Sequence, residues 1–185
     1  MSIKELTMGH HKAAEEQPFV GVMFSGKLDA RTYAIFAYNQ YLMYEALENA
    51  ALDKDVLGYD FPDINRASAL KADYLELWEE ASPPPTLETT KKFVQYISEV
   101  QDPDSIFAHV YTRHMGDLMG GQMLAKKVPG SSHMYVFENP DKLKGLIRAK
   151  LNDDMADEVR VAYGFATRTF KEMLPYAQTI QEDQQ

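Results

Sequence analysis

The chain has 185 residues, of which 45% are apolar and 25% charged, and its formal net charge is −9. This composition is typical of one globular domain with a sizeable core, and the acidic balance argues against nucleic acid as its main partner. Cysteine is absent, which excludes disulfides, thiolate ligands and cysteine nucleophiles.

Helical periodicity dominates the chain from end to end. The expected helices are, in chain order, Ile3–Glu16, Asp29–Ala51, Ile64–Ala81, Thr86–Val100, Ser105–Lys127, Pro140–Asn152 and Asp154–Ala177. Tyr59–Pro62 is expected to form a turn. No pair of alternating segments joined by a hairpin turn appears. The sequence therefore predicts an all-α, single-domain protein (residues 1–185) of about seven helices.

Several boundaries have recognisable signals. Asp29 and Asp63 are predicted N-caps of the second and third helices, and Asp102–Asp104 are predicted to cap the fifth. Pro129–Val136 is expected to be a loop that contains a short extended piece at Met134–Phe137.

The most unusual segment is Tyr111–Gln122, which places Gly116, Gly120 and Gly121 inside a predicted helix. Each interior glycine costs a helix about 1 kcal/mol relative to alanine, or roughly 3 kcal/mol for the three together. Gly116 and Gly120 share one helix face, and a face without side chains lets a large group approach the backbone closely. A close crossing of two helices, or a kink, is the competing interpretation.

The first helix carries a candidate metal ligand, although the five histidines form no HExxH or paired ExxH motif. Lys4, His11 and Glu15 fall in a narrow stripe along one face, and a glutamate one turn beyond a histidine can orient its ring. An ordinary half-buried histidine is the alternative, because a lone imidazole needs a macrocycle such as haem to complete a metal site. His109 is a second candidate ligand, about 10 Å of helix rise from Gly116.

Two pairs of charged residues have the spacing of neighbours on a helix. Arg113 and Asp117 would pair along the surface, or Asp117, next to Gly116, would direct its carboxylate towards a ligand and hold a water there. Lys144 and Arg148 lie on one face of the strongest basic segment, which suits the binding of carboxylates. A solvated charged face is the common alternative for such a segment.

Together these residues resemble the haem oxygenase family. YTRHMGDLMGGQMLAKK is similar to the distal-helix signature of that family, and HHKAAEEQPF to the segment with the proximal ligand. YEALENAA and YDFPDINRASALKADYLELW resemble further family blocks, and the likeness runs from Lys4 to about Leu174. It implies a multi-helix haem oxygenase-like fold with haem between a proximal and a distal helix.

The resemblance also implies roles for individual residues. His11 would be the axial ligand of the haem iron, with Glu15 as the hydrogen-bond partner of its imidazole. Gly116 and Gly120 would form the floor over which the porphyrin lies. Asp117 would anchor a distal water network together with Tyr44 and Arg113. The positions that match propionate contacts in the family are Lys4, Tyr111, Lys144 and Arg148.

The activity implied by this likeness is the cleavage of haem, as both substrate and cofactor, at the α meso carbon. The products would be biliverdin, carbon monoxide and ferrous iron, formed with O2 and electrons from ferredoxin or another reductase. A bilin reductase would be a downstream partner. No apolar run approaches the ~20 residues of a membrane span, so we expect no membrane anchor. The likeness to soluble bacterial, plastid or phage-borne members implies the cytoplasm, a plastid stroma or a host cytoplasm.

The sequence departs from the family pattern at several places. Met119 stands where a serine is usual, and His114 replaces an aromatic residue. Ala166 stands where an amide often joins the distal network, with Thr167 as a candidate replacement. A haem-binding carrier or sensor without turnover is therefore one alternative, and a helical protein in which the glycines only pack helices is another.

Overall fold

The computed structural model describes residues 1–57, 61 and 63–183, with side chains up to residue 178, and the regular elements in this part of the chain are all helices. The α-helices are α1 (Ile3–Glu15), α2 (Pro18–Phe24), α3 (Ala30–Asp53), α4 (Ala67–Leu77), α5 (Glu88–Glu99), α6 (Pro103–Leu124), α7 (Pro140–Lys150) and α8 (Ala156–Asp183). Two 3-10 turns, η2 (His133–Tyr135) and η3 (Asp153–Met155), precede α7 and α8. The predicted all-α class is confirmed. The predicted turn at Tyr59–Pro62 lies, apart from Phe61, outside the described residues.

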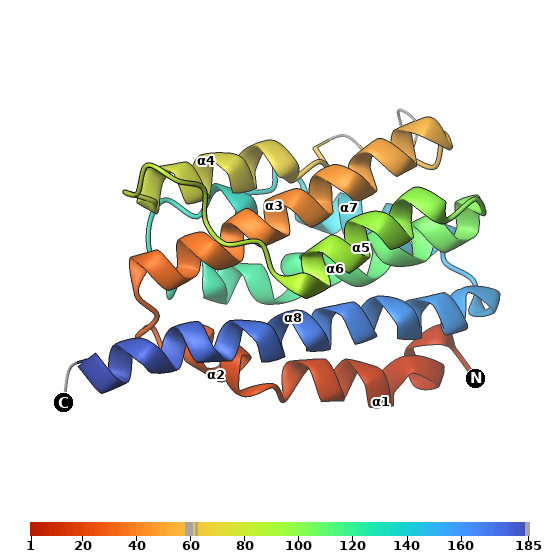
Figure 1. The fold of residues 1–185 in the computed structure, drawn as a ribbon. Coiled ribbons are helices and arrows are strands. Elements are labelled where there is room, and N and C mark those ends of the chain that lie inside the picture. Colours follow the sequence, from red (N-terminus) through yellow and green to blue (C-terminus); the bar gives the residue numbers. More distant parts are fainter. Residues whose placement is uncertain (58–60, 62, 184–185) are drawn as a thin grey trace.

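The long helix α8 supports one side of the helix assembly (Figure 1). The helices α1, α2, α5 and α6 all pack against it. On the far side of α5 and α6, α3 packs against both of them and against α4. Because α1 and α6 share α8 as a support, the position of α8 fixes the space between them.

Local capping explains where three of the helices begin. At α1, Ser2 and Glu5 form a reciprocal capping box. The carboxylate of Asp29 accepts a hydrogen bond from the third residue of α3, and Asp102 does the same for α6. The two predicted caps at Asp29 and Asp102 are confirmed.

The predicted cap at Asp63 is wrong. Asp63 has a positive φ of 60° and α4 begins only at Ala67. The carboxylate of Glu48, on α3, accepts hydrogen bonds from the backbone N–H groups of Arg66 and Ala67. A carboxylate at a helix N-terminus satisfies free N–H groups and the helix dipole. Here it comes from a neighbouring helix, so local sequence gives no sign of it.

Two further segments differ from the prediction. An additional helix, α2, was not predicted, and Pro18 occupies its first turn, where the fixed φ of proline is favourable. The predicted extended piece at Met134–Phe137 is also wrong in its first half, because His133–Tyr135 form a 3-10 turn.

One of the three interior glycines of α6 has a packing role. A Cβ atom on Gly121 would lie 2.7 Å from Cδ1 of Tyr135, which is closer than non-bonded carbon atoms approach each other in proteins. Gly121 is buried, and its missing side chain lets the Tyr135 ring lie against the helix backbone. Gly121 therefore allows close packing, as the competing interpretation of the glycines proposed, but the group that packs against it is an aromatic ring and not a second helix.

We expect Gly121→Ala to destabilise the protein by about 1–3 kcal/mol, because the added methyl group overlaps a buried ring. Urea unfolding followed by circular dichroism measures this. Gly9→Ala in α1 is the matched control, since no atom lies within 4 Å of a Cβ there and the change should be neutral or stabilising. Equal stability of the two variants would contradict the packing role of Gly121.

Candidate functional site

A cavity of about 570 Å³ lies between α1 and α6, with further walls from α3, α7 and α8. This volume lies within the range of small-molecule and cofactor sites. The predicted site residues that line it are Lys4, His11, Glu15, Tyr44, Tyr111, Arg113, Gly116, Asp117, Gly120 and Arg148. Lys144 does not line the cavity, and its ammonium group lies 3.7 Å from the carboxylate of Asp141.

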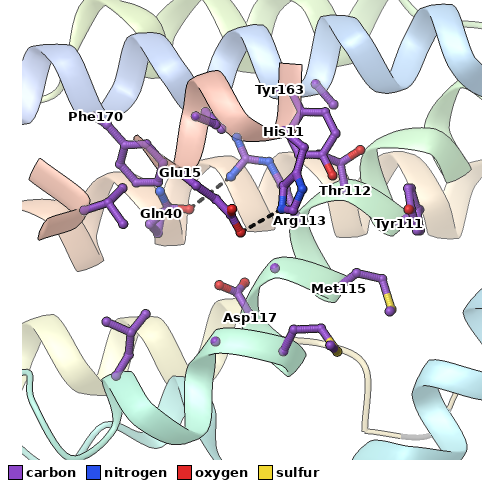
Figure 2. A pocket seen from close by; sticks show the side chains of 18 of the residues that line it. His11, Glu15, Gln40, Tyr111, Thr112, Arg113, Met115, Asp117, Tyr163 and Phe170 are labelled. Atoms are coloured by element: carbon purple, nitrogen blue, oxygen red, sulfur yellow. Dashed lines mark hydrogen bonds and ion pairs between the residues drawn. The ribbon is translucent and has the colours of Figure 1, made fainter. Parts of the chain in front are cut away.

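The α1 wall presents one imidazole. Nε2 of His11 lies 2.8 Å from Oε1 of Glu15, one helical turn further on, and the ring packs against that of Tyr163 with a centroid distance of 5.4 Å. Nδ1 of His11 makes no hydrogen bond with any residue that the structure describes. The ring thus has one nitrogen held by a carboxylate and one available to a ligand (Figure 2).

The facing wall on α6 is bare backbone. A Cβ on Gly116 would meet no atom within 4 Å, and one on Gly120 would meet only Cζ of Phe24, at 3.7 Å. Both glycines line the cavity, so unlike Gly121 they are not needed for packing within the protein. The absence of their side chains leaves free space next to the backbone of α6.

Asp117 is the acidic group on the α6 wall, opposite His11 in Figure 2. The hydroxyl group of Tyr44 donates a hydrogen bond to Oδ2 of Asp117. Burial raises the pKa of Asp117 to about 6, although this hydrogen bond and the charges of Arg113 and Arg66 act in the opposite direction. Burial and the charge of Asp117 also hold the pKa of Tyr44 well above its ordinary value. The Asp117 carboxyl group can therefore gain and lose a proton near neutral pH.

Arg113 does not pair with Asp117 along the surface, which was one of the two alternatives for these residues. Its Nη1 donates to Oε1 of Gln40 at 3.0 Å, and its Nη2 lies 3.1 Å from the sulfur of Met43. The guanidinium group also stacks on the Phe93 ring, 4.3 Å from the centroid. It is thus held on the α3 and α5 side of the cavity by three contacts.

The remaining cationic groups of the lining are Lys4 from α1 and Arg148 from α7. Burial raises the pKa of Tyr111, while the charge of Arg148 acts to lower it, so these two residues lie close to each other. The cavity therefore combines an apolar interior with cations that suit the carboxylates of a ligand.

Residues 1–171 match the sequence profile of the family described as "Heme oxygenase". The chain belongs to the haem oxygenase family. It is 30% identical to haem oxygenase 2 of Macaca fascicularis, over 92% of this chain and 64% of that protein, so it spans less than two thirds of that relative. Its fold is similar to the haem oxygenase of Leptospira interrogans, with a TM-score of 0.79, 27% identity and coverage of 93% and 100% of the two chains. It is also similar to haem oxygenase-1 of the cyanobacterium Synechocystis in complex with haem, with a TM-score of 0.85, 21% identity and coverage of 98% and 95%.

Membership in the haem oxygenase family agrees with the resemblance that the sequence motifs indicated. Within the described part of the chain, no helix combines the length and the apolar character of a membrane span.

Two histidines of α6 lie away from the cavity. His109, the second candidate ligand, is fully buried and its Nε2 lies 2.8 Å from Oε1 of Glu158. His114 contacts the carbonyl oxygens of Val110 and Ile64 at 2.8 and 3.0 Å, and burial lowers its pKa to about 4. Neither ring lines the cavity, which leaves His11 as the histidine placed to bind a ligand there.

Several residues of the cavity lining were not predicted from the sequence. Gln40 lies one turn before Tyr44 on the same face of α3, a spacing that could have revealed it. Tyr33 and Tyr135 also line the cavity, and their buried hydroxyl groups interact with each other. Tyr135 comes from a turn, where no periodicity indicates which side chains point inwards. Ala166 lines the cavity as well, whereas Thr167, the candidate substitute for the missing amide, does not.

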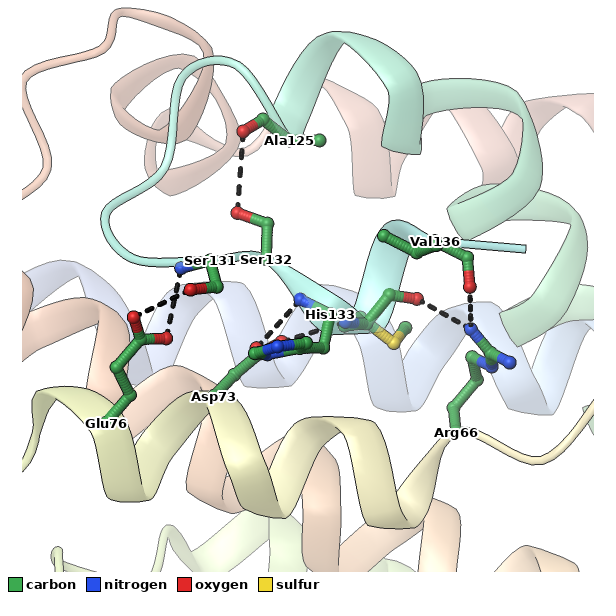
Figure 3. A network of polar contacts seen from close by, with 9 residues as sticks. Arg66, Asp73, Glu76, Ala125, Ser131, Ser132, His133 and Val136 are labelled. Carbon is green, nitrogen blue, oxygen red and sulfur yellow. Dashed lines mark hydrogen bonds and ion pairs between the residues drawn. The ribbon is translucent and has the colours of Figure 1, made fainter. Parts of the chain in front are cut away.

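A network of polar contacts holds this turn against α4 (Figure 3). The buried carboxylate of Asp73 accepts hydrogen bonds from the backbone N–H groups of His133 and Met134 at 2.8 and 2.9 Å. Arg66 donates to the carbonyl oxygens of Met134 and Val136. These contacts fix the segment that carries Met134 and Tyr135 into the cavity wall.

The same network brings Asp73, Glu76 and His133 together, with potential ligand atoms within 4.8 Å of one another. The carboxylate of Glu76 accepts hydrogen bonds from the backbone and side chain of Ser131. Asp73 also contacts Nδ1 of His133 at 2.8 Å. Hydrogen bonds to the segment after α6 thus account for the cluster.

We expect Asp117→Asn to stabilise the protein at pH 7 by on the order of 1–3 kcal/mol, since asparagine avoids the cost of burying a carboxylate. The folded-state pKa of Asp117 lies near 6, above its ordinary value of 3.8, so this cost appears as the pH rises from about 4 to above 6. Thermal unfolding of both proteins across this range measures the difference. A difference that did not shrink towards pH 4 would contradict the raised pKa.

Proposed function

We propose that this protein cleaves haem at the α meso carbon to biliverdin, carbon monoxide and ferrous iron, using O2 and an external electron donor. The observation that carries this proposal is one cavity with a carboxylate-bonded imidazole, His11, on one wall and bare backbone at Gly116 and Gly120 on the other. Membership in the haem oxygenase family supports it.

The residues present fit haem. A flat ligand needs a wall without side chains, and the space next to Gly116 is open. Haem also carries two carboxylates, for which Lys4 and Arg148 provide cations in the lining. When bound, haem would supply the iron that activates O2 and the ring that is cleaved.

On the α1 side, His11 would hold the iron through the nitrogen that Glu15 does not occupy. A carboxylate bonded to the other ring nitrogen fixes the orientation of an imidazole and raises its basicity. The Tyr163 ring, packed against that of His11, further restricts its rotation. These residues would orient the imidazole that holds the iron.

On the α6 side, Asp117 would hold and move protons at its carboxyl oxygens. A group whose pKa lies near the working pH transfers protons efficiently in both directions. Tyr44 fixes the carboxylate by donating to Oδ2. The absence of side chains at Gly116 and Gly120 would let the ring lie close to this carboxyl group.

Cationic residues would determine which edge of the ring is presented for cleavage. Lys4 and Arg148, with the hydroxyl group of Tyr111, would bind the propionates and prevent rotation of haem in its plane. Lys144 would join them only if it released Asp141.

Ferredoxin is the electron donor that we propose, with a bilin reductase as a partner that consumes the product. Both are what the resemblance to soluble bacterial, plastid or phage-borne members implies. The proposed compartment is the cytoplasm, a plastid stroma or the cytoplasm of a host cell.

The decisive test is a single turnover. We expect the purified protein, mixed with haem, air and ascorbate or reduced ferredoxin, to lose its Soret absorption and to yield the spectrum of biliverdin. His11→Ala should change the ferric spin state, because the proximal imidazole is lost. His10→Ala is the matched control, since His10 is exposed and does not line the cavity. A stable haem complex under these conditions would indicate a carrier or sensor, and no haem binding would refute the proposal.

We expect Gly116→Ala to stabilise the ligand-free protein by about 0.5–1 kcal/mol, because alanine favours a helix interior and its methyl group meets open space here. The same methyl group would occupy space that haem needs, so haem affinity should fall by roughly tenfold or more. Chemical unfolding and haem titration measure the two effects. Gly9→Ala should raise stability without a loss of affinity, and an unchanged affinity in Gly116→Ala would argue against haem lying on this backbone.

A further inference from the structure

Gln40 occupies a position in the cavity for which its neighbours suggest a function. It lies on α3 one turn before Tyr44, and its side chain is half-buried and lines the cavity. Its Oε1 accepts the hydrogen bond from Nη1 of Arg113 at 3.0 Å (Figure 2).

The chemistry of the two groups fixes the orientation of the amide. A guanidinium group only donates hydrogen bonds, so the oxygen of Gln40 must face Arg113 and the NH2 group must face away. This NH2 group makes no hydrogen bond with any of the described residues. Its two donors are therefore available to whatever fills the cavity.

Without Gln40, Arg113 would have another partner nearby. Asp117 lies four residues further along α6, a spacing at which a carboxylate and a guanidinium group pair readily. Attraction between opposite charges is stronger in a buried cavity than in water. In the structure Arg113 is nevertheless bonded to Gln40, with the Met43 sulfur and the Phe93 ring as its other contacts.

We propose that Gln40 is a positioning residue of this site, which holds the Arg113 guanidinium group apart from Asp117 and turns two amide N–H donors towards the cavity. The inference rests on the proposed function for its effect on catalysis, but the arrangement of Gln40, Arg113 and Asp117 is a property of the ligand-free protein. Asp117 thereby remains free of a direct cationic partner.

This arrangement bears on the protonation of Asp117. The other ionisable groups that face it are Tyr33 and Tyr44 of α3, Arg66 before α4, and Tyr135 of η2. Arg66 is held by hydrogen bonds to backbone carbonyl oxygens. Arg113 is thus the cation whose release would place a positive charge against the Asp117 carboxylate.

The test is the pH titration of the Asp117 side chain, followed by carbon-13 NMR of the ligand-free protein and assigned with Asp117→Asn. The wild-type carboxyl group should titrate near its raised pKa of about 6. Gln40→Leu releases Arg113, and an adjacent guanidinium group lowers a carboxyl pKa by roughly 1–3 units. Gln40→Met is a second variant of this kind that keeps the length of the side chain.

Gln40→Glu is the matched control, because its carboxylate still accepts from Arg113. Its Asp117 pKa should stay at or above that of the wild type. An Asp117 pKa equal to that of the wild type in both Gln40→Leu and Gln40→Met would overturn the proposal. A similar fall of this pKa in Gln40→Glu would overturn it as well.

A second readout uses the haem-loaded protein, in which the pH profile of biliverdin formation should move to lower pH in Gln40→Leu and not in Gln40→Glu. If the wild type formed no biliverdin, the proposed function would fail, while the NMR titration would still decide the role of Gln40. The two failures are therefore distinguishable.

Discussion

The site depends on two helices that are held apart by a third. Both α1 and α6 pack against α8, and the cavity lies between them. His11 and Gly116 are therefore placed opposite each other by helix packing, without a direct bond between the two walls. Such a gap is costly, because a folding chain gains by filling space next to apolar surface. The missing side chains of Gly116 and Gly120 and the support from α8 are the features that keep it open.

The polar groups of the cavity also lower the stability of the folded protein, because they are not arranged in the most favourable pairs. A carboxylate in a protein interior normally pairs with a cation. Asp117 instead accepts a hydrogen bond from the hydroxyl group of Tyr44, while Arg113 donates to the amide oxygen of Gln40. A direct ion pair would lower the pKa of this carboxyl group far below neutral pH and would suppress its exchange of protons. Sites under selection for function commonly keep such strained or incompletely paired groups.

Features that depend on residues close together in the sequence were predicted, whereas features that depend on contacts between distant segments were not. The stripe of His11 and Glu15 and the shared face of Gly116 and Gly120 follow from helical spacing, and the structure places these residues in one cavity. The caps at Asp29 and Asp102 act within one turn and were equally visible. The start of α4 was missed because its cap, Glu48, comes from another helix.

Other parts of the site were beyond the reach of sequence patterns for the same reason. The bond between Gln40 and Arg113 joins residues on two helices, and neither residue type indicates the other. Tyr135 enters the cavity from a 3-10 turn whose position is set by Asp73 on α4. Tertiary contacts of this kind carry no periodicity, so only the folded structure shows them.

The use of α8 as a common support also links local unfolding to ligand release. Proteins open in cooperative units, and a unit that contains α8 would include the contacts of both walls. Detachment of α8 would release α1, for which α8 is the main support, whereas α6 would keep its contacts with α3, α7 and η2. A ligand held between the two walls would therefore protect the backbone amides of α1 from hydrogen exchange more strongly than those of α6.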